Sequence, residues 1–258
     1  MHKGEKVSVI FPTYNEKDSI RAAIEDFFAT GLVDEIVVVN NNAAPGTSGE
    51  VAATRAVEVH EPKQGYGHAL QRGMAEATGD IFILAEPDGT FSGHDVRKLL
   101  AYAEDVDVVF GTRTSRIFIW EGANMGIFLK WGNYAVGKLV EFLFNTTILT
   151  DVGCTMKLLR RRVYEQIQPS FRIGGSHFGP HLMLLIITRG FPFVEIPVNY
   201  RQRVGESSVT GNFFKAFRLG VIMIGMVLKA RFQSLFVPGS VYHRGTGAQL
   251  GNSSRRGN

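Results

Sequence analysis

In the first half of the chain, uninterrupted apolar runs alternate with segments in which apolar residues recur every three or four positions. Apolar runs without polar alternation are typical of strands buried on both faces, and the wider spacing is typical of helices. Strands are predicted up to Pro12 and at 34–40, 56–60, 81–86 and 106–113. Helices are predicted at 20–31, 67–79 and 95–105. This alternation indicates an α/β fold with a mostly parallel, Rossmann-like sheet that helices cover on both faces.

The second half has longer apolar segments that carry large side chains on more than one face. The segment 118–151 is predicted to be largely helical, and a strand and a helix follow in 154–167. A helix, a strand and an arginine-bearing loop are predicted in 179–211. The predicted organisation is one domain at 1–211, an appended helix at 212–232, and a Gly- and Ser-rich tail at 233–258 that we expect to be disordered.

Composition narrows this picture only slightly. The 258 residues suit one large core with an appendage, and the single cysteine, Cys154, excludes an internal disulfide and favours a reducing compartment. The N-terminus turns polar directly after its first apolar run, so we do not expect a signal peptide. The net charge of +4 suits an anionic membrane surface or a phosphate-bearing substrate. We expect no nucleic-acid partner, and the pattern leaves homo-oligomers open.

Polar clusters follow four of the predicted strands. They lie at 12–16, 40–42, 86–88 and 111–113. In open parallel sheets, ligands bind beyond the carboxyl ends of the strands, and these ends share one edge of the sheet. The sequence therefore predicts a binding site at this edge before any chemistry is assigned.

The stretch "IFILAEPDGTF" ends a buried strand with two carboxylates, Glu86 and Asp88. One interpretation is a solvated turn, because Pro-Asp-Gly is good turn chemistry. The other is a site for Mg²⁺ or Mn²⁺, which prefer oxygen ligands and are commonly completed by substrate phosphates. Because the pair directly follows a strand at the predicted edge, we favour the metal.

Two further loops have ligand-binding chemistry. Gly65 and Gly67, in "GYGHAL", allow either a close approach of a phosphate or ribose to a helix start or a purely structural turn. The loop "YRQRVGESS" at 200–208 combines two arginines, a glycine and two hydroxyls, which fits phosphate binding or an ordinary exposed basic loop. Both pairs of interpretations stay open on these residues alone.

Six segments, in order, carry a resemblance to a known family. They are "VSVIFPTYNE", "EIVVVNNNAAPGT", "GYGHALQRGMAEATGDIFILAEPDGTF", "VVFGTR", "TDVGCTMKLLRR" and "VEIPVNYRQRVGESS". Together they resemble the family-2 glycosyltransferases of the GT-A fold. Within that family the chain is most similar to the polyprenyl-phosphate hexosyltransferases, such as dolichol-phosphate mannose synthase. The resemblance covers about residues 6–230.

The resemblance implies a role for each matching residue. Residues that would bind the nucleotide sugar are Pro12, Tyr14, Glu16, Asn41, Gly67, Glu86 and Asp88. Glu86 and Asp88 would hold the metal. Residues that would bind the donor diphosphate or the acceptor phosphate are Arg113, Arg201, Arg203 and Ser207. Asp88, Asp151 and Arg203 would act in catalysis, with Asp151 near the reacting sugar.

The chain departs from the family pattern at several positions. Asn40 stands where Asp is usual, which leaves the base preference open, and Glu86 replaces a shorter Asp. Ser208 stands where many members have Lys, which removes a phosphate-binding charge. His181 stands where many have Glu, and we interpret it as a helix histidine that faces the rim of the core.

Two apolar segments suggest a membrane surface. The run 219–228 lacks charge, is too short to span a bilayer, and is flanked by cations at 215, 218, 229 and 231. We therefore expect residues 212–230 to lie in the interface of an anionic membrane. For 118–144, which carries Trp120 and Trp131, a membrane contact and packing in a core or dimer interface remain equal alternatives.

The resulting hypothesis is an inverting, metal-dependent transferase on the cytoplasmic face of a membrane. It would move a hexose from a UDP- or GDP-sugar to a polyprenyl or dolichyl phosphate, an acceptor that needs no strong base. One alternative is a transferase of the same fold that acts on a glycan or protein hydroxyl, with Asp151 as the base. Another is an inactive protein that only binds nucleotide sugar.

Overall fold

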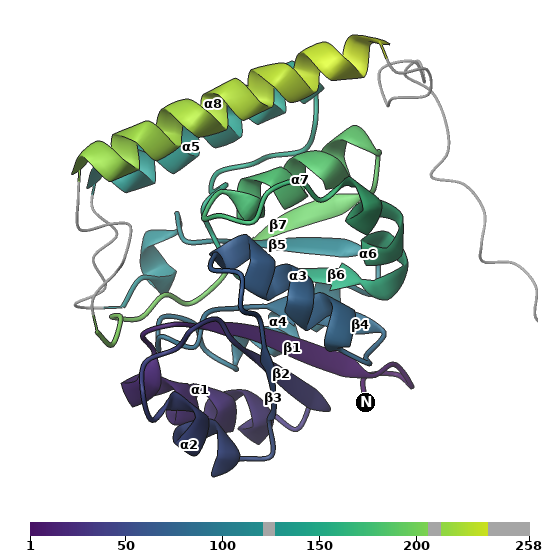
Figure 1. Cartoon of the computed structure of the whole chain (residues 1–258). Coiled ribbons are helices and arrows are strands. Elements are labelled where there is room, and N and C mark those ends of the chain that lie inside the picture. Colours follow the sequence, from purple (N-terminus) through teal and green to yellow (C-terminus); the bar gives the residue numbers. More distant parts are fainter. Residues whose placement is uncertain (121–126, 206–212, 237–258) are drawn as a thin grey trace, which may run out of the picture.

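The computed structural model describes residues 1–120, 127–205 and 213–236, and its centre is a seven-stranded sheet (Figure 1). The strands are β1 (Val7–Thr13), β2 (Glu35–Asn40), β3 (Val57–His60), β4 (Ile81–Leu84), β5 (Val108–Thr112), β6 (Lys157–Arg160) and β7 (Phe193–Pro197). They lie in the order β3-β2-β1-β4-β6-β5-β7. The pairs among β1 to β4 are parallel, as is the pair β5–β7. The predicted α/β fold with a mostly parallel sheet is confirmed.

Strand β6 is the exception, because it runs antiparallel to both of its neighbours, β4 and β5. Its residues Leu158 and Leu159 are buried on opposite faces, as in the parallel strands. An apolar run of this kind shows that a strand is buried on both sides but does not reveal its direction.

The prediction that Pro12 stops the first strand is wrong by one residue. β1 continues to Thr13, and Pro12 pairs in register with Val39 of β2. The carbonyl of Ile10 accepts from Ala85, so Ile10 and Pro12, two positions apart, both direct their backbone groups toward the β4 side. β4 has already ended there, so the N–H that proline lacks has no ladder partner to lose.

Eight α-helices are described. They are α1 (Lys17–Ala29), α2 (Thr47–Ala52), α3 (Tyr66–Glu76), α4 (Asp95–Tyr102), α5 (Ile127–Phe144), α6 (Arg161–Ile167), α7 (Phe178–Thr188) and α8 (Phe213–Phe236). Two short 3₁₀ turns lie at Arg116–Phe118 and Gln168–Ser170. The short helix α2 was not predicted. α3 ends at Glu76 rather than 79, because Ala77 is extended and leads the chain back to the sheet.

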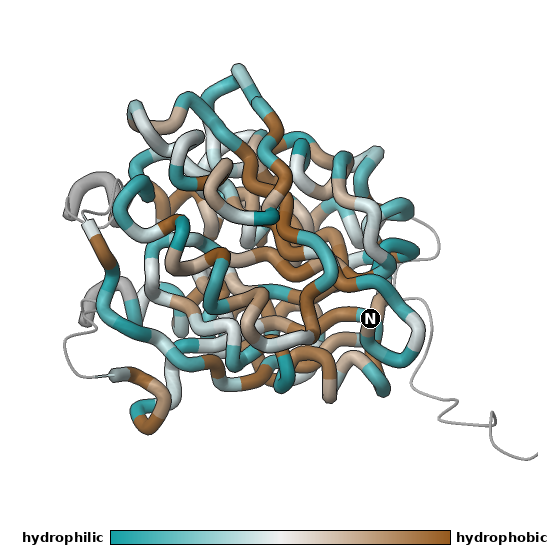
Figure 2. The backbone as a smooth tube through the Cα atoms, turned by 90° about the horizontal axis from the view of Figure 1, so that it is seen from below, coloured by the Kyte–Doolittle hydropathy of each residue, from teal (hydrophilic) through white to brown (hydrophobic). Residues whose placement is uncertain are grey.

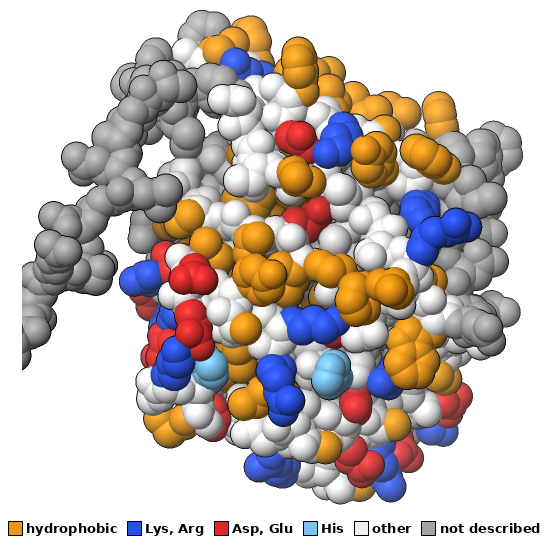
Figure 3. All heavy atoms as spheres, turned by 180° about the vertical axis from the view of Figure 1, so that it is seen from behind, with side chains coloured by type: hydrophobic (Ala, Val, Ile, Leu, Met, Phe, Trp, Pro, Cys, Tyr) orange, Lys and Arg blue, Asp and Glu red, His pale blue; other side chains and the backbone are white. Residues whose placement is uncertain are grey.

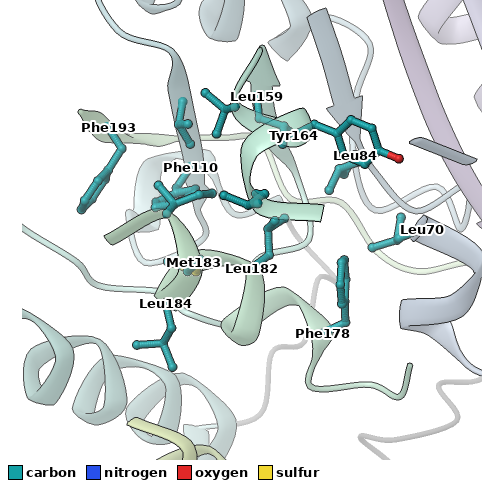
Figure 4. Close-up of a cluster of buried hydrophobic side chains, with 14 of the residues drawn as sticks. Leu70, Leu84, Phe110, Leu159, Tyr164, Phe178, Leu182, Met183, Leu184 and Phe193 are labelled. Atoms are coloured by element: carbon teal, nitrogen blue, oxygen red, sulfur yellow. The ribbon is translucent and has the colours of Figure 1, made fainter. Parts of the chain in front are cut away.

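Helices cover both faces of the sheet, and each face has its own apolar core. On one face Val9 and Phe11 of β1 pack with residues of α1 and α4. On the other, Ile10 of β1 packs with residues of α3, α6 and α7. Figure 4 shows part of this second core, and Figure 2 shows the hydrophobic segments running through the interior. Side chains that alternate along one strand thus anchor helices on opposite sides.

The helices α5 and α8 lie outside this layered arrangement. They run side by side, α8 also contacts α7, and the pair forms a separate layer at the top of Figure 1. The predicted helical segment 118–151 is helical only from Ile127 to Phe144 among the described residues, which exclude 121–126. The helix predicted at 212–232 is described from Phe213 and extends to Phe236, while residue 212 lies outside the described residues. The tail predicted from 233 lies, beyond 236, outside the described residues.

Within the ranges that the structure describes, none of the helices has the length and apolarity needed to cross a membrane.

Candidate active site

A cavity of about 480 Å³ opens where β1, β2 and β4 end and extends to helix α8. Seven of the residues predicted from the sequence line it together. They are Pro12, Tyr14, Glu16, Asn41, Glu86, Arg113 and Arg203. Side chains that are distant in the sequence therefore meet at the edge of the sheet where the strand ends predicted a site.

Glu16 fixes the turn that follows β1. Its carboxylate accepts hydrogen bonds from the backbone N–H groups of Tyr14, at 2.7 Å, and Asn15, at 2.9 Å. It also accepts from the hydroxyl of Thr13, at 3.2 Å. The Tyr14 ring is 45% exposed beside this turn, so it can contact a ligand without displacing protein groups.

Asn41 lies beside this turn, and its backbone N–H donates to the carbonyl of Thr13, at 3.0 Å. Its amide donates to the carbonyls of Glu61, at 2.7 Å, and Lys63, at 2.9 Å, and its oxygen accepts from the backbone of Gly65. Asn40, one residue earlier, instead donates to Glu58 and Ser48. Of these neighbouring asparagines, Asn40 thus ties β2 to α2 and β3, whereas Asn41 holds the loop before α3 and lines the cavity.

Arg203 lies between the two carboxylates that follow β4. Its Nε donates to Oδ2 of Asp88, at 2.7 Å, and one terminal nitrogen donates to Oε2 of Glu86, at 3.3 Å. The other Asp88 oxygen accepts from the backbone N–H and the hydroxyl of Thr90. Asp88 is 1% exposed and lies behind Glu86, which faces the cavity.

The surroundings of Glu86 disfavour the charged form of its carboxyl group. Burial, together with the negative charge of Asp88, raises the pKa of Glu86 to about 8, although Arg203 opposes the shift. Two adjacent carboxylates of this kind fit a hard divalent cation, which would stabilise both in their charged form. They supply only part of a coordination sphere, so a cation here would also need oxygens from a ligand.

Asp151 forms a tight pair with Arg113. The Arg113 guanidinium donates to both Asp151 oxygens, at 2.8 and 3.0 Å, and its backbone N–H donates at 3.0 Å. Burial alone would raise the pKa of Asp151, but the charge and hydrogen bonds of Arg113 hold it below its usual range. Asp151 is completely buried and does not line the cavity, whereas Arg113 does. Its role in the structure is to orient Arg113.

Of the predicted residues that the structure describes, four do not line the cavity: Asp88 and Asp151, which contact the lining residues Arg203 and Arg113, and Gly67 and Arg201. A Cβ on Gly67 would lie 2.7 Å from Phe178 and 2.8 Å from the carbonyl of Ile173, which supports the structural interpretation of that glycine. Arg201 points away, donating to Ser92 at 2.9 Å and stacking over Trp120. Ser207, like Ser208, lies outside the described residues.

Several residues that line the cavity were not predicted. Tyr66 and Tyr200 lie within motifs that were singled out, but neither was given a role. Thr155, in the segment before β6, also lies within a motif that was singled out, whereas Asn133 reaches the cavity from α5, where no motif was noted. Cys154 also lines it, and burial raises its pKa to about 12, so the thiol stays protonated.

His181 agrees with its interpretation as a histidine at the rim of the core. It lies in α7 with its ring 6.4 Å from that of Phe178, and it does not line the cavity. Burial lowers the pKa of His181, which favours the neutral ring.

The far end of the cavity is apolar. Leu219 and Met223 of α8 line it there, together with Pro180 of α7 and Val152. The cavity thus connects a charged end, with Glu86, to a hydrocarbon-lined end under α8. This arrangement fits a ligand that is itself polar at one end and apolar at the other.

Comparisons with known proteins agree on a family. The profile described as "Glycosyl transferase family 2" matches residues 8–168. A dolichyl-phosphate hexose transferase of Haloferax volcanii is 27% identical over 209 residues, which are 80% of this chain and 87% of the relative. An uncharacterized glycosyltransferase of Mycobacterium tuberculosis is 27% identical over 213 residues, 81% of this chain and 92% of that protein.

Solved structures share the fold. Glucosyl-3-phosphoglycerate synthase from Mycobacterium tuberculosis, in complex with Mn²⁺, UDP and phosphoglyceric acid, superposes with a TM-score of 0.68. It is 18% identical, and the match covers 89% of this chain and 79% of that one. The complex of the same enzyme with Mn²⁺, UDP-glucose and phosphoglyceric acid gives 0.67 at 19% identity, covering 89% and 81%. The fold of this chain is therefore that of the GT-A glycosyltransferases.

Proposed function

Because the chain belongs to glycosyl transferase family 2, we propose that it transfers a hexose from a UDP- or GDP-sugar to a polyprenyl or dolichyl phosphate, with inversion and with a divalent metal. The observation that carries this proposal is the shape of the cavity. Its charged end holds Glu86, Arg113 and Arg203, and its apolar end reaches Leu219 and Met223. A lipid phosphate has the same division between a charged head and a hydrocarbon chain.

The charged end supports binding of a nucleotide sugar. Tyr14 and Asn41 line the wall where a base and ribose would lie, and Glu16 holds the turn between them and β1. Glu86 and Asp88 would hold Mg²⁺ or Mn²⁺, and a metal bound there would supply positive charge to stabilise the leaving diphosphate. The relatives with solved structures bind Mn²⁺ and UDP, which supports the same chemistry here.

The pairing of Asp151 with Arg113 favours a phosphate acceptor over a hydroxyl acceptor. A general base must have a free oxygen within reach of the acceptor proton. Both Asp151 oxygens accept from Arg113, and the lowered pKa makes the carboxylate a weak base. A phosphate is already ionised near neutral pH, so Arg113, held by Asp151, can position it without a proton transfer.

The apolar layer of α5 and α8 supports attachment to a membrane surface. Large apolar side chains of both helices are exposed: Trp131, Tyr134 and Phe142 on α5, and Val221, Ile222, Ile224, Leu228 and Leu235 on α8. Figure 3 shows hydrophobic side chains along the upper edge of the molecule, where Figure 1 places these helices. We propose that the two helices together, and not α8 alone, lie in the interface of an anionic membrane.

One experiment tests the function directly. The full-length protein is incubated with Mn²⁺, a polyprenyl phosphate and a panel of labelled UDP- and GDP-sugars, and label is followed into the lipid phase. We expect transfer from one donor, with a product in which the anomeric configuration is inverted. Transfer only to a glycan or peptide hydroxyl would contradict the lipid acceptor while leaving the family assignment intact.

A further inference from the structure

Arg203 occupies the place between the two carboxylates that a cation would take. Its guanidinium contacts Asp88 and Glu86 at once, with the Nε to Asp88 distance at 2.7 Å. The other arginine among the described lining residues, Arg113, directs its Nε and one terminal nitrogen to Asp151 instead. The carboxylates are therefore already balanced in part by a positive charge from the chain itself.

The backbone holds Arg203 in this position. The N–H of Arg201 donates to the carbonyl of Thr90, at 2.8 Å, and the N–H of Val204 donates to the carbonyl of Asp88, at 2.9 Å. These two bonds fix the segment on either side of Arg203 to the same loop that carries the carboxylates. The guanidinium can turn about its side-chain torsions, but its Cα stays beside the site.

A divalent cation and the Arg203 guanidinium cannot both contact the same two carboxylates without repelling each other. A metal ion that binds alone would have to displace Arg203 from both carboxylates. Among the described residues that line the cavity, the other carboxylate is that of Glu16, one of whose two oxygens already accepts three hydrogen bonds. A nucleotide diphosphate changes this balance, because its oxygens can accept from the displaced guanidinium and also complete the metal's coordination.

Building on the proposed function, we propose that Arg203 is an internal counter-ion that keeps the metal site closed until a nucleotide diphosphate binds. Arg203 then exchanges its carboxylate partners for the diphosphate, and Glu86 and Asp88 become available to the metal. Metal and nucleotide binding are coupled through this exchange, and Arg203 acts as a positioning residue that sets their order. The metal's affinity for the free protein is reduced by the fraction of molecules in which Arg203 holds the carboxylates.

The test measures Mn²⁺ binding rather than catalysis. Full-length protein is titrated with Mn²⁺, and the free ion is followed by electron paramagnetic resonance, with and without UDP. For the wild type we expect UDP to tighten Mn²⁺ binding by a factor in the usual range of coupling between ligands, about 5- to 150-fold. For Arg203→Met we expect Mn²⁺ to bind the UDP-free protein about tenfold more tightly than it binds the wild type.

Matched variants separate charge from structure. Arg203→Lys keeps a cation on the same segment and should stay close to the wild type. Arg203→Gln removes the charge but keeps a polar side chain, and it replaces Arg203→Met should that variant fail to fold. Arg201→Ala removes the neighbouring arginine, which contacts Ser92 and not the carboxylates, and should leave Mn²⁺ binding to the UDP-free protein unchanged.

The experiment distinguishes failure of the counter-ion proposal from failure of the proposed function. If neither neutral variant binds Mn²⁺ more tightly than the wild type in the absence of UDP, the counter-ion proposal is overturned, while the proposed function stands. If the wild type binds neither UDP nor GDP, and binds no Mn²⁺ in the presence of either nucleotide, the proposed function itself fails.

Discussion

The strand ends around Glu86 and the helix layer of α5 and α8 are built in opposite ways. At the strand ends, polar side chains find their partners within the protein, as Glu16 does with three donors and Asp151 does with Arg113. In the helix layer, large apolar side chains remain on the surface, such as Phe142, which is 82% exposed, and Trp131, which is 65% exposed. In the first region most polar groups are paired within the protein, and the second presents hydrocarbon to its surroundings.

Because of this difference, substitutions in the two regions should have different effects. A preorganised polar site loses chemistry or stability when one partner is removed, because the group left behind is buried and unpaired. An exposed apolar layer can lose a side chain without loss of folding, but it then loses attachment to whatever covers it.

The largest effect is expected at Asp88. Asp88→Asn removes a negative charge from the proposed metal site, and we expect transfer to fall on the order of 10³-fold, which corresponds to several kcal/mol of charge stabilisation. Excess chelator should have the same effect on the wild type. The measurement is label transfer into lipid, and Asp105→Asn, at an exposed position, is the control. Full activity in excess chelator would exclude the metal.

The next effect is expected at Asp151. Asp151→Asn leaves the buried Arg113 guanidinium without its counter-ion, and removal of one partner of a buried pair costs about 3–5 kcal/mol in the free energy of unfolding. Denaturant unfolding measures this loss. The KM for the acceptor should rise as Arg113 loses its orientation.

A different outcome for Asp151→Asn would support the alternative hypothesis, in which the acceptor is a hydroxyl group. If unfolding is unchanged and kcat falls on the order of 10²-fold or more, Asp151 is a general base. Loss of stability together with a raised KM supports the positioning of a phosphate by Arg113.

A smaller effect is expected at Ile224, which is 41% exposed on α8. Ile224→Asp replaces an apolar contact with a charge, and loss of a buried isoleucine is equivalent to about 1.5–3 kcal/mol, or roughly 10- to 150-fold in affinity for anionic vesicles. Vesicle co-sedimentation measures it. Tyr102→Asp, at a similarly exposed residue on the far side of the sheet, is the matched control.

Two results would contradict the prediction that α8 lies in a membrane interface. Equal vesicle binding by Ile224→Asp and the wild type would exclude α8 from the interface, and unfolding of the variant would place Ile224 in an interface between protein surfaces. High salt should weaken attachment only in part, because the apolar contribution is not screened.

The smallest effect is expected from the titration of Glu86 in the chelated protein. Its pKa of about 8 in the folded protein lies above the usual value of 4.5, so between these pH values the folded state binds more protons than the unfolded state. The stabilising contribution is thus fully present below pH 4.5 and is lost as the pH rises toward 8. The slope cannot exceed about 1.4 kcal/mol per pH unit for one group.

Denaturant unfolding in chelator measures this slope between pH 5 and 8, which is roughly the range between the two pKa values. The variant Glu86→Gln should have a flatter dependence of stability on pH. An identical slope in the wild type and the variant would show that Glu86 does not titrate in this range. The pH dependence would then have to come from other groups.

The sequence predicted the parallel strands and the polar edge because both follow from local patterns. Apolar runs such as 36–39 and their polar ends are read directly from the chain, and Glu86, Asn41 and Tyr14 lie where those ends predicted. The direction of β6 could not be predicted, since a strand buried on both faces has the same pattern in either direction.

Contacts between distant segments also could not be predicted from sequence patterns. Arg201 and Arg203 are chemically identical and two positions apart, yet they point to Ser92 and to the Glu86–Asp88 pair. The pairing of Asp151 with Arg113 joins residues 38 positions apart, and it changes the chemical role that a free carboxylate would have. Only the tertiary fold decides such choices.

Helix α8 combines two surfaces within a single turn. Met223 is buried and lines the cavity, while its neighbours Ile222 and Ile224 face outward at 38% and 41% exposure. The helix is therefore both the roof of the cavity and part of the outer wall of the molecule. In mechanical terms, any force that tilts or lifts α8 from outside changes the volume of the cavity beneath it, because side chains of α8 themselves form part of the cavity wall.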